Sequence, residues 1–257
     1  MKRLVILGGG ESGVGAALLG KEKKYDVFLS DSGKITQTYK DVLTHNEIEW
    51  EDEGHTSSKI FNADLVVKSP GIPDHIPLIK SLHEASISII SEIEFASVFT
   101  TATIIGITGS NGKTTTTMMV HHILDQAGFD VAIGGNIGDS FAKQVLNNTA
   151  NYVLELSSFQ LDGIDQFRPH IAIITNITPD HLDRYDYNFE AYVASKFRIA
   201  MNQTSEDYLI YNADDEVIVS YINTHPIQST LVPFSLTKTV ANGAFLEQNN
   251  IIIEFNT

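Results

Sequence analysis

One segment constrains the fold more than any other: an apolar run, a glycine-rich turn and a Lys-Thr pair at the start of a helix. The apolar run is Thr103–Ile107, the turn has the sequence Thr-Gly-Ser-Asn-Gly, and Lys113 and Thr114 precede the helix-like run Thr116–Ala127. In such a turn the backbone N–H groups and the positive end of the helix dipole face an anion, and the lysine adds a full charge. The segment therefore predicts a phosphate site.

The turn departs from the strict phosphate-loop pattern GxxxxGK[ST] at its first position. That pattern places glycine at position 107, where this chain has Ile107, and Gly106 stands one residue early. An ordinary glycine-rich turn before a helix is the alternative, but turn chemistry alone does not account for Gly-Lys-Thr-Thr at a helix start. The hydroxyl of Thr114 is placed where a phosphate-bound Mg²⁺ needs an oxygen ligand.

Composition and charge exclude several classes of protein. The chain has 257 residues, which favours two domains, and its 42% apolar content is that of a globular protein. No apolar run approaches membrane-spanning length, and the absence of cysteine excludes a disulfide scaffold or a cysteine-based zinc site. We therefore expect a cytoplasmic protein without membrane insertion. The formal charge of −15 argues against a nucleic-acid partner, so any nucleotide must be held by local groups.

Strand-like and helix-like segments alternate along the chain, which predicts parallel sheets covered by helices. The first series of strands is Arg3–Leu7, Asp26–Leu29, Asp64–Val67 and Ile87–Ile90, with a helix at Pro77–Ala85. The second series is Thr103–Ile107, Val131–Ile133, Tyr152–Leu156, Ile171–Thr175 and Tyr208–Asn212, followed by Thr230–Phe234 and a pair, Gly243–Leu246 and Ile251–Phe255, about residues 248–250. We predict an α/β protein with a Rossmann-like N-terminal domain, residues 1–92, and a P-loop ATPase-type α/β central domain, residues 93–257.

A second glycine-rich turn follows the first strand. Gly8–Gly13 satisfies GxGxxG, and Asp31 ends the next strand, where an acid usually meets a ribose. This half alone predicts NAD binding, but the same geometry serves any nucleotide diphosphate, and Ser12 offers an extra hydroxyl to a phosphate. Ser69 and Gly71 flank a proline at another strand end, at the sheet edge where ligands bind; a plain Pro-Gly turn is the alternative there.

Four residues of the second half fall at strand ends or on helices beside them: Asn136, Glu155, His181 and Lys196. An acid at the end of an apolar strand near a phosphate turn is placed to hold Mg²⁺, directly or through water. Each residue also has a simpler interpretation. Glu155 fits a solvent-facing strand end, His181 fits a turn, and Lys196 fits a solvated helix lysine.

Together these segments resemble a known family. The segments TGSNGKTT, GGNIG, LELSSFQL, NITPDHLDRY and a later Ala-Ser-Lys are similar to those of the Mur ligases of peptidoglycan synthesis, in consistent order up to about Asp215. The Ser-Ser-Phe-Gln-Leu after Glu155 and the Ser-Pro-Gly at 69–71 favour the branch that adds D-glutamate to UDP-N-acetylmuramoyl-L-alanine. The phosphate turn of that family has the form TGxNGK[ST], which accounts for Ile107.

The resemblance implies a role for each matched residue. The residues that would hold ATP are Gly109, Ser110, Asn111, Gly112, Lys113, Thr114 and Thr115. The residues that would hold the UDP-linked substrate are Ser12, Asp31, Ser69, Gly71 and Asn136, the last facing the muramoyl-alanine part. The catalytic residues would be Lys113, Glu155, His181 and Lys196, and the ligands of two Mg²⁺ ions would be Thr114, Glu155, His181 and Lys196, the lysine after carbamylation by CO₂.

The resemblance also implies an activity: an ATP-dependent amide ligase that works through an acyl phosphate, in a monomeric cytoplasmic enzyme. The third, C-terminal domain of the family, which binds D-glutamate, has no counterpart here, and a late motif of the SGxHNxxN type is absent. We therefore expect a truncated, N-terminal part of a ligase that is inactive alone. Two alternatives stay open, an NAD-dependent dehydrogenase, suggested by the first half only, and a non-catalytic UDP-sugar-binding module.

Overall fold

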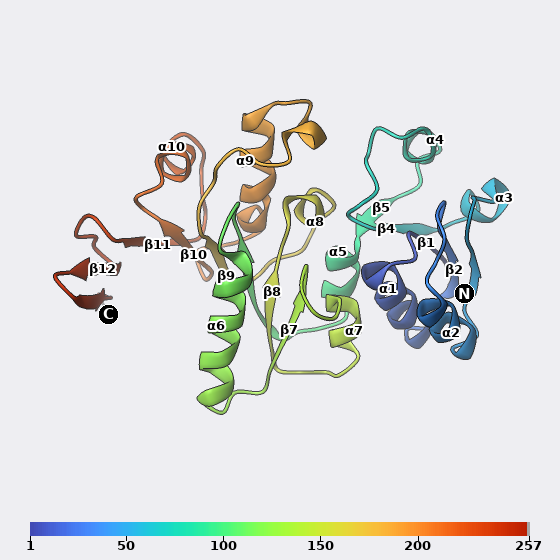
Figure 1. The fold of residues 1–257 in the computed structure, drawn as a ribbon, viewed down its shortest axis with the longest axis horizontal. Helices are drawn as coiled ribbons and strands as arrows, with labels where there is room; N and C mark the ends of the chain where they lie inside the picture. The colour runs from blue at the N-terminus through green and yellow to red at the C-terminus, as the bar shows by residue number, and fades with distance from the viewer. Residues whose placement is uncertain (256–257) are drawn as a thin grey trace. The chain divides into compact units, whose positions relative to one another are not determined.

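The computed structural model describes residues 1–255 and contains two α/β units, each with its own largely parallel sheet (Figure 1). Unit 1 comprises Met1–Ala102, Ala132–Ala150 and Phe159–Phe167, and unit 2 comprises Thr103–Val131, Asn151–Ser158 and the chain from Arg168 onward. The predicted α/β class is confirmed, whereas the predicted boundary between residues 92 and 93 stays a prediction. No helix within residues 1–255 is both long enough and apolar enough to cross a membrane.

Unit 1 has the strand order of a Rossmann-type sheet. Its strands are β1 (Arg3–Leu7), β2 (Asp26–Ser30), β3 (Glu49–Glu51), β4 (Leu65–Lys68) and β5 (Ile89–Ser91). Its helices are α1 (Glu11–Glu22), α2 (Gln37–His45), α3 (Ser57–Ile60), α4 (Pro77–Glu84), α5 (Glu92–Ser97) and α7 (Phe141–Val145). All five strands are parallel in the order β3-β2-β1-β4-β5, so the order reverses between β1 and β4. Ligands bind at such a reversal, beyond the carboxyl ends of the strands.

Helices cover both faces of this sheet, with α1 and α2 on one side and α3 and α4 on the other (Figure 1). Val5 and Leu7 of β1 pack with Ile79 of α4 in one buried cluster, as the two-residue period of a strand requires. On the other face, α1 approaches β1 so closely that a Cβ on Gly13 would lie 1.9 Å from the carbonyl oxygen of Gly8. The third glycine of the GxGxxG turn is therefore a packing requirement.

Unit 2 carries the second predicted series of strands. Seven strands of its sheet are ordered β13-β12-β11-β10-β9-β6-β8. These are β6 (Thr103–Thr108), β8 (Asn151–Glu155), β9 (Ile171–Ile174), β10 (Tyr208–Asn212), β11 (Thr230–Ser235), β12 (Gly243–Glu247) and β13 (Asn250–Glu254). The helical elements are α6 (Lys113–Gln126), η1 (Leu182–Tyr185), α9 (Phe189–Phe197), η2 (Arg198–Ala200) and α10 (Glu216–Thr224). The helix α8 (Ser158–Asp162) starts at the last residue of a unit 2 segment and continues in unit 1. A further strand, β7 (Val131–Gly135), starts in unit 2 and continues in unit 1.

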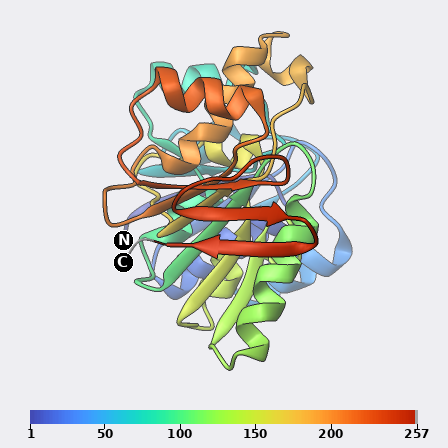
Figure 2. The same cartoon turned by 90° about the vertical axis from the view of Figure 1, so that its left-hand side faces the viewer.

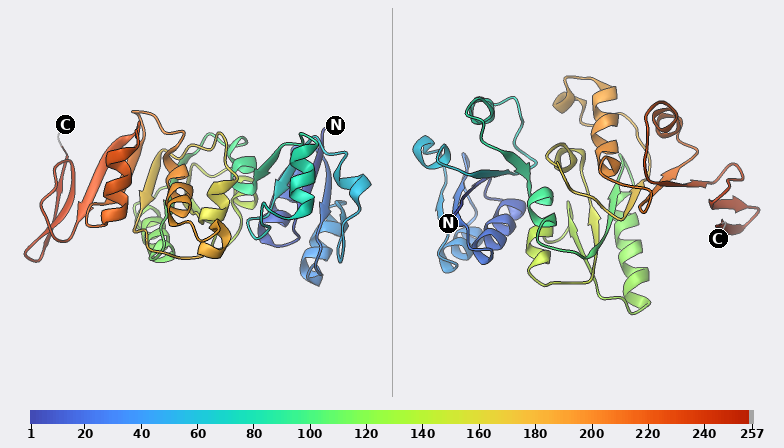
Figure 3. Two further views of the ribbon diagram at one scale, coloured as in Figure 1. Left: turned by 90° about the horizontal axis from the view of Figure 1, so that it is seen from above. Right: turned by 180° about the vertical axis from the view of Figure 1, so that it is seen from behind.

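In unit 2, α6 covers one face of the sheet, and α9 and α10 lie on the other (Figures 1 and 3). Ile105 and Ile107 of β6 pack in a buried cluster with Val153 of β8, against Val120 and Leu124 of α6. The parallel strands β8, β6, β9 and β10 place their carboxyl ends at one edge of the sheet. The phosphate turn follows β6 at this edge.

The predicted pairing of the last two strands is confirmed. β12 and β13 run antiparallel, with Glu247 opposite Asn250, so Gln248 and Asn249 form the turn (Figure 2). The other predicted strands are also present, with ends shifted by one or two residues. The sequence analysis did not predict two short, charged elements. β3 has the sequence Glu-Trp-Glu, which lacks an apolar pattern, and α5 begins at the predicted domain boundary.

Buried carboxylates hold α5 in place within unit 1. The carboxylate of Glu94 accepts hydrogen bonds from the backbone N–H groups of Asp165, Gln166 and Phe167, at 2.8 to 3.0 Å. Glu92 accepts one from the N–H of Ala142 at the start of α7. Burial raises the pKa of Glu92 to about 8, although the Ala142 N–H opposes this shift. Glu92 is therefore largely protonated at neutral pH.

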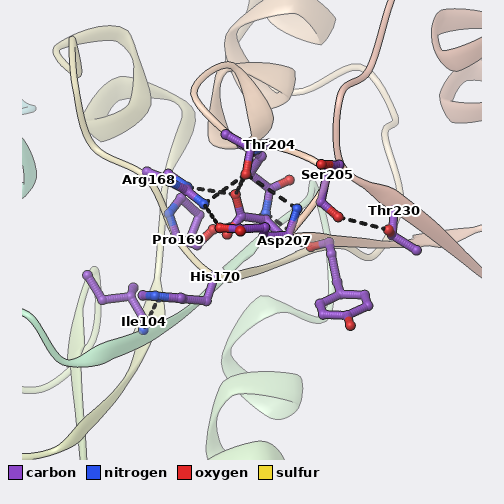
Figure 4. Close-up of polar contacts among 11 residues, drawn as sticks. Ile104, Arg168, Pro169, His170, Thr204, Ser205, Asp207 and Thr230 are labelled. Atoms are coloured by element: carbon purple, nitrogen blue, oxygen red, sulfur yellow. Dashed lines mark hydrogen bonds and ion pairs between the residues drawn. The ribbon is translucent and has the colours of Figure 1, made fainter.

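A polar cluster holds the amino ends of β9, β10 and β11, away from the phosphate turn (Figure 4). The guanidinium of Arg168 donates to the Asp207 carboxylate at 2.6 Å and to the Thr204 hydroxyl at 2.8 Å. Asp207 is buried, which pushes its pKa up, but the hydrogen bonds from Arg168 and Thr204 outweigh this and lower the pKa. The N–H of Thr230 donates to the carbonyl of Asp207 and joins β11 to the same cluster. These hydrogen bonds stabilise the edge of the sheet at which β9, β10 and β11 begin.

Candidate nucleotide and substrate sites

The phosphate turn of unit 2 depends on two glycines with positive φ. Gly109 has φ +149°, and a Cβ there would lie 2.0 Å from the hydroxyl oxygen of Thr175. Gly112 has φ +79° with open space around it, and it caps the amino end of α6. At Gly109 a side chain is excluded because it would collide with Thr175. At Gly112 a side chain is disfavoured by the positive φ alone.

The residues that follow β9 hold this turn in shape. The N–H of Ser110 donates to the carbonyl of Asn176 at 2.8 Å, and the Ser110 hydroxyl donates to the carbonyl of Thr178 at 2.8 Å. The N–H of Asn111 donates to the side-chain oxygen of Asn176 at 2.9 Å. Sequence reasoning missed these supporting residues. The sequence signal for them was the polar pair Thr175 and Asn176 directly after an apolar strand, with Thr178 two residues further on.

Two lysine side chains meet at one carbonyl of the turn. The Lys113 ammonium donates to the carbonyls of Gly109 and Ser110, both at 3.0 Å, and the Lys196 ammonium donates to the Gly109 carbonyl at 2.8 Å. Lys196 is only 2% exposed and its Nζ lies 4.6 Å from the ring centre of Tyr192. The interpretation of Lys196 as a solvated helix lysine is therefore wrong.

Tyr192 of α9 also supports the turn. Its hydroxyl lies 3.0 Å from the hydroxyl of Ser110. Burial raises the pKa of Tyr192 above its ordinary value, although the hydrogen bond with Ser110 opposes this shift. The phenol therefore stays protonated and available for hydrogen bonding at neutral pH.

Thr114 and Glu155 form the second feature of the site. The Thr114 hydroxyl donates to the Glu155 carboxylate at 2.7 Å. Glu155 ends β8 and is 2% exposed, so its interpretation as a solvent-facing strand end is wrong. A hydroxyl and a carboxylate are the hard oxygen ligands that Mg²⁺ prefers, and the pair stands at the start of the helix that carries Lys113. These residues fit an ion bound together with a phosphate.

His181 lies on an exposed segment before η1. Its backbone has φ 49°, its side chain is 59% exposed, and its Nε2 lies 3.6 Å from the carboxylate of Asp180. Across residues 1–255, no group of three or more His, Asp and Glu side chains is arranged to hold a metal. The predicted ligand set contains only two residues of these types, Glu155 and His181, and the role of His181 stays a prediction. Asn111, Gly112, Thr114 and Thr115 are exposed at the turn.

In unit 1, the loops after β1, β2 and β4 converge. The Asp31 carboxylate accepts hydrogen bonds from the N–H of Gly9 at 2.5 Å and from that of Gly33 at 2.7 Å. A Cβ on Gly8 would lie 2.4 Å from the hydroxyl oxygen of Ser69, so the glycine turn and the Ser-Pro-Gly turn are in contact. Ser12 is half-buried in the first turn of α1. The predicted residues therefore gather where the strand order reverses.

Asn136 lies in the loop between β7 and α7, which also belongs to unit 1. It is exposed, and the next glycine, Gly138, has φ +64°. The carboxylate of Glu11, at the start of α1, accepts a hydrogen bond from the N–H of Ser140 at 3.1 Å. The loop that carries Asn136 is thus tied to the glycine turn of the same unit. No pattern in the sequence indicates this contact.

These features are of two classes: a Rossmann-type glycine turn in unit 1 and a P-loop-type turn with a Thr–Glu pair in unit 2, each a candidate nucleotide site. A family model of the Mur ligase middle domain matches residues 107–253, and a model of the MurD N-terminal domain matches residues 3–76. The chain belongs to the Mur ligase family.

Curated relatives cover nearly all of this chain. A UDP-N-acetylmuramoylalanine--D-glutamate ligase of Christiangramia forsetii is 61% identical over 99% of this chain and 58% of the relative. The protein of the same name in Cytophaga hutchinsonii is 51% identical over 98% of this chain and 57% of the relative. The chain thus spans less than two thirds of the length of these relatives.

Solved structures with a similar fold have lower identity. The UDP-N-acetylmuramate:L-alanyl-gamma-D-glutamyl-meso-diaminopimelate ligase from Neisseria meningitides has a TM-score of 0.67 and 18% identity, over 99% of this chain and 85% of that one. The UDP-N-acetylmuramate-alanine ligase MurC from Thermotoga maritima has a TM-score of 0.56 and 22% identity, over 95% of this chain and 56% of that one. Both comparisons support the fold alone.

Proposed function

We propose that this chain carries the ATP site and the UDP-substrate site of a cytoplasmic, monomeric ligase that joins D-glutamate to UDP-N-acetylmuramoyl-L-alanine. The observation that carries the proposal is the phosphate turn with Lys113 and the Thr114–Glu155 pair, in a chain 61% identical to a relative of that name. In this proposal residues 1–92 form the UDP-substrate domain and residues 93–257 form the ATP domain.

At the ATP site, the N–H groups at the amino end of α6 face the phosphates, and Lys113 binds the β- and γ-phosphates. The N–H groups of Ser110 and Asn111 instead hold the turn in shape through Asn176. In the structure the Lys113 ammonium donates to two carbonyls of the turn. Phosphate oxygens are stronger acceptors than carbonyls, so the ammonium exchanges these bonds for phosphate when ATP binds. The positive end of the α6 dipole adds to the attraction, which the net charge of −15 cannot supply.

The chemistry follows from the poor reactivity of a carboxylate toward an amine. An oxygen of the L-alanyl carboxylate attacks the γ-phosphorus of ATP, the bond to the bridging oxygen breaks, and ADP leaves. The product is an acyl phosphate. The amine of D-glutamate then attacks the acyl carbon, a proton leaves the nitrogen, and the C–O bond to phosphate breaks. Lys113 neutralises charge that develops on the transferred phosphoryl group.

Thr114 and Glu155 are the residues we propose for one Mg²⁺, and His181 with carbamylated Lys196 for the second. The Thr114 hydroxyl and the buried Glu155 carboxylate are 2.7 Å apart, and both are oxygen ligands of the kind that would hold Mg²⁺. The ions would supply positive charge beside the phosphates during transfer. Until an ion binds, the hydrogen bond to Thr114 keeps the Glu155 carboxylate oriented.

For carbamylation the Lys196 ammonium first loses one proton, and its neutral amine then adds to CO₂ and releases a second proton. The buried cation thereby becomes an anion. Adding ¹³C-bicarbonate and Mg²⁺ to the chain is expected to give one protein-bound carbamate signal by ¹³C NMR. The signal is expected to disappear in Lys196→Met, which keeps most of the side-chain volume, and to persist in Lys59→Met, a surface control. A spectrum that is the same in Lys196→Met would show that Lys196 is not carbamylated.

In unit 1, we propose that Ser12, Asp31, Ser69 and Gly71 hold the uridine diphosphate and that Asn136 contacts the muramoyl-alanine part. A dehydrogenase is not favoured. NAD binding accounts for the glycine turn of unit 1 but leaves the phosphate turn at Lys113 unexplained. A non-catalytic UDP-sugar module leaves the Thr114–Glu155 pair unexplained in the same way.

Ligand binding to the 257-residue chain tests the proposal. We expect UDP-N-acetylmuramoyl-L-alanine and ATP with Mg²⁺ each to raise the melting temperature, and NADH to leave it unchanged. Adding EDTA is expected to remove most of the ATP effect and none of the UDP-substrate effect. Stabilisation by NADH but by neither proposed ligand would refute the ligase assignment.

A further inference from the structure

Glu11 is an unusual residue for a diphosphate-binding turn. It lies inside Gly8–Gly13 and is the first residue of α1. A carboxylate there interacts favourably with the helix dipole, but it competes for the same positive end with any bound diphosphate. The side chain is 32% exposed, so solvent alone does not screen its charge. The contacts of Glu11 with other segments of unit 1 indicate a role other than binding the diphosphate.

Three groups from other segments of unit 1 surround the Glu11 carboxylate. One oxygen accepts from the N–H of Ser140 at 3.1 Å, and the other accepts from the hydroxyl of Tyr39 at 3.0 Å. The ammonium of Lys143 lies 3.9 Å from the first oxygen and 2.5 Å from the carboxylate of Asp139. The hydrogen bond to Asp139 raises the pKa of Lys143, so this lysine stays charged and partly compensates Glu11.

The hydrogen bond to Ser140 fixes the end of the loop that carries Asn136. Ser140 is fully buried, and Gly15 of α1 lies so close that a Cβ on it would be 1.9 Å from the Ser140 hydroxyl oxygen. The N–H of Gly135 donates to the carbonyl of Asp139 at 3.3 Å and closes the loop at its base. Residues 136–138 are thereby held between Gly135 at one end of the loop and Ser140 at the other, on one side of α1.

We propose that Glu11 is a positioning residue, which sets the spacing between the glycine turn and the Asn136 loop so that diphosphate and muramoyl-alanine are held together. The inference rests on the proposed function, because it assigns the two loops to the two ends of one substrate. Glu11 acts through Ser140 and does not touch substrate. Its two hydrogen bonds also draw the carboxylate toward Tyr39 and Ser140, which limits repulsion of the diphosphate.

The test compares two ligands, UDP and UDP-N-acetylmuramoyl-L-alanine, by calorimetric titration of the whole chain. The wild type is expected to bind the second ligand more tightly, because only that ligand reaches Asn136. Glu11→Ala is expected to reduce this preference about tenfold, because the buried N–H of Ser140 loses its acceptor. The affinity for UDP is expected to stay within about threefold of the wild-type value. Glu11→Gln is expected to restore most of the preference, since its amide oxygen can still accept from Ser140.

Tyr39→Phe is the matched control. It removes a hydrogen bond to the same carboxylate but leaves the one to Ser140, so the preference is expected to fall by less than threefold. Amide hydrogen exchange adds a local measurement without ligand. Exchange at Ser140 is expected to accelerate in Glu11→Ala, and exchange at Gly9, which is held by Asp31, is expected to stay the same.

If Glu11→Ala does not fold, Glu11→Asp replaces it, because the shorter side chain keeps the charge at the start of α1 and withdraws the oxygens from Ser140. A Glu11 variant that folds and keeps the full preference of the wild type would overturn the inference. A wild type that binds both ligands equally would instead refute the proposed role of Asn136, so the two failures are distinguishable.

Discussion

Replacing Lys113 by alanine is expected to raise the dissociation constant of ATP with Mg²⁺ by about 10²- to 10³-fold. Lys113 is the charged group of the phosphate turn, and its ammonium donates to the carbonyls of Gly109 and Ser110. In the proposed function it exchanges these two bonds for bonds to phosphate. Two hydrogen bonds to a charged group are together worth about 3–4 kcal/mol, and each 1.4 kcal/mol is about tenfold in affinity. Isothermal titration of the 257-residue chain measures the change directly.

Two comparisons separate this effect from a loss of folding. Lys59→Ala removes a lysine whose ammonium pairs with Glu49 on the surface of unit 1, and it is expected to leave ATP affinity unchanged. Binding of UDP-N-acetylmuramoyl-L-alanine to Lys113→Ala is expected to match the wild type, because the proposed UDP residues lie in unit 1. Unchanged ATP affinity in Lys113→Ala, with folding intact, would favour the non-catalytic UDP-sugar module.

The sequence predicted most of the fold because its signals are local. A strand, a glycine turn and a helix start are encoded within about a dozen residues, so both glycine turns and their flanking elements were placed correctly. The resemblance implied that Thr114 and Glu155 hold one ion, and the structure places the two side chains in contact because the neighbouring parallel strands β6 and β8 end at one edge of the sheet. Where a motif combines turn residues with a position at the end of a strand, the sequence is sufficient to predict where the motif lies in the fold.

Features that depend on packing between distant segments were not predictable. The burial of Lys196 arises because α9 lies against the phosphate turn, a contact between residues 87 positions apart. The support of the turn by Asn176 and Thr178 joins segments more than 60 residues apart. The contact between Glu11 and Ser140 spans 129 positions. Each involves polar residues without periodic spacing, so no local pattern indicates its partner.

Replacing Gly109 by alanine is expected to lower the unfolding free energy of unit 2 by about 3–5 kcal/mol. The new Cβ would lie 2.0 Å from the Thr175 hydroxyl oxygen, and φ +149° is strained for any side chain. Moving the turn to relieve this contact also moves the Gly109 carbonyl, which both Lys113 and Lys196 use as an acceptor. ATP affinity is therefore expected to fall with stability.

Gly112→Ala is the matched comparison, because it adds the same methyl group to the same turn in open space. Its φ of +79° predicts a cost of about 1–2 kcal/mol from backbone strain alone, and Gly112→Asn is expected to recover part of it. Urea unfolding, detected by amide exchange in β6 and β9, measures the unfolding free energy of unit 2 in both variants. Equal costs for Gly109→Ala and Gly112→Ala would mean that contact with Thr175 does not limit the turn. A larger cost for Gly109→Ala would mean that the approach of β9 fixes the turn, and with it the shared acceptor of the two lysines.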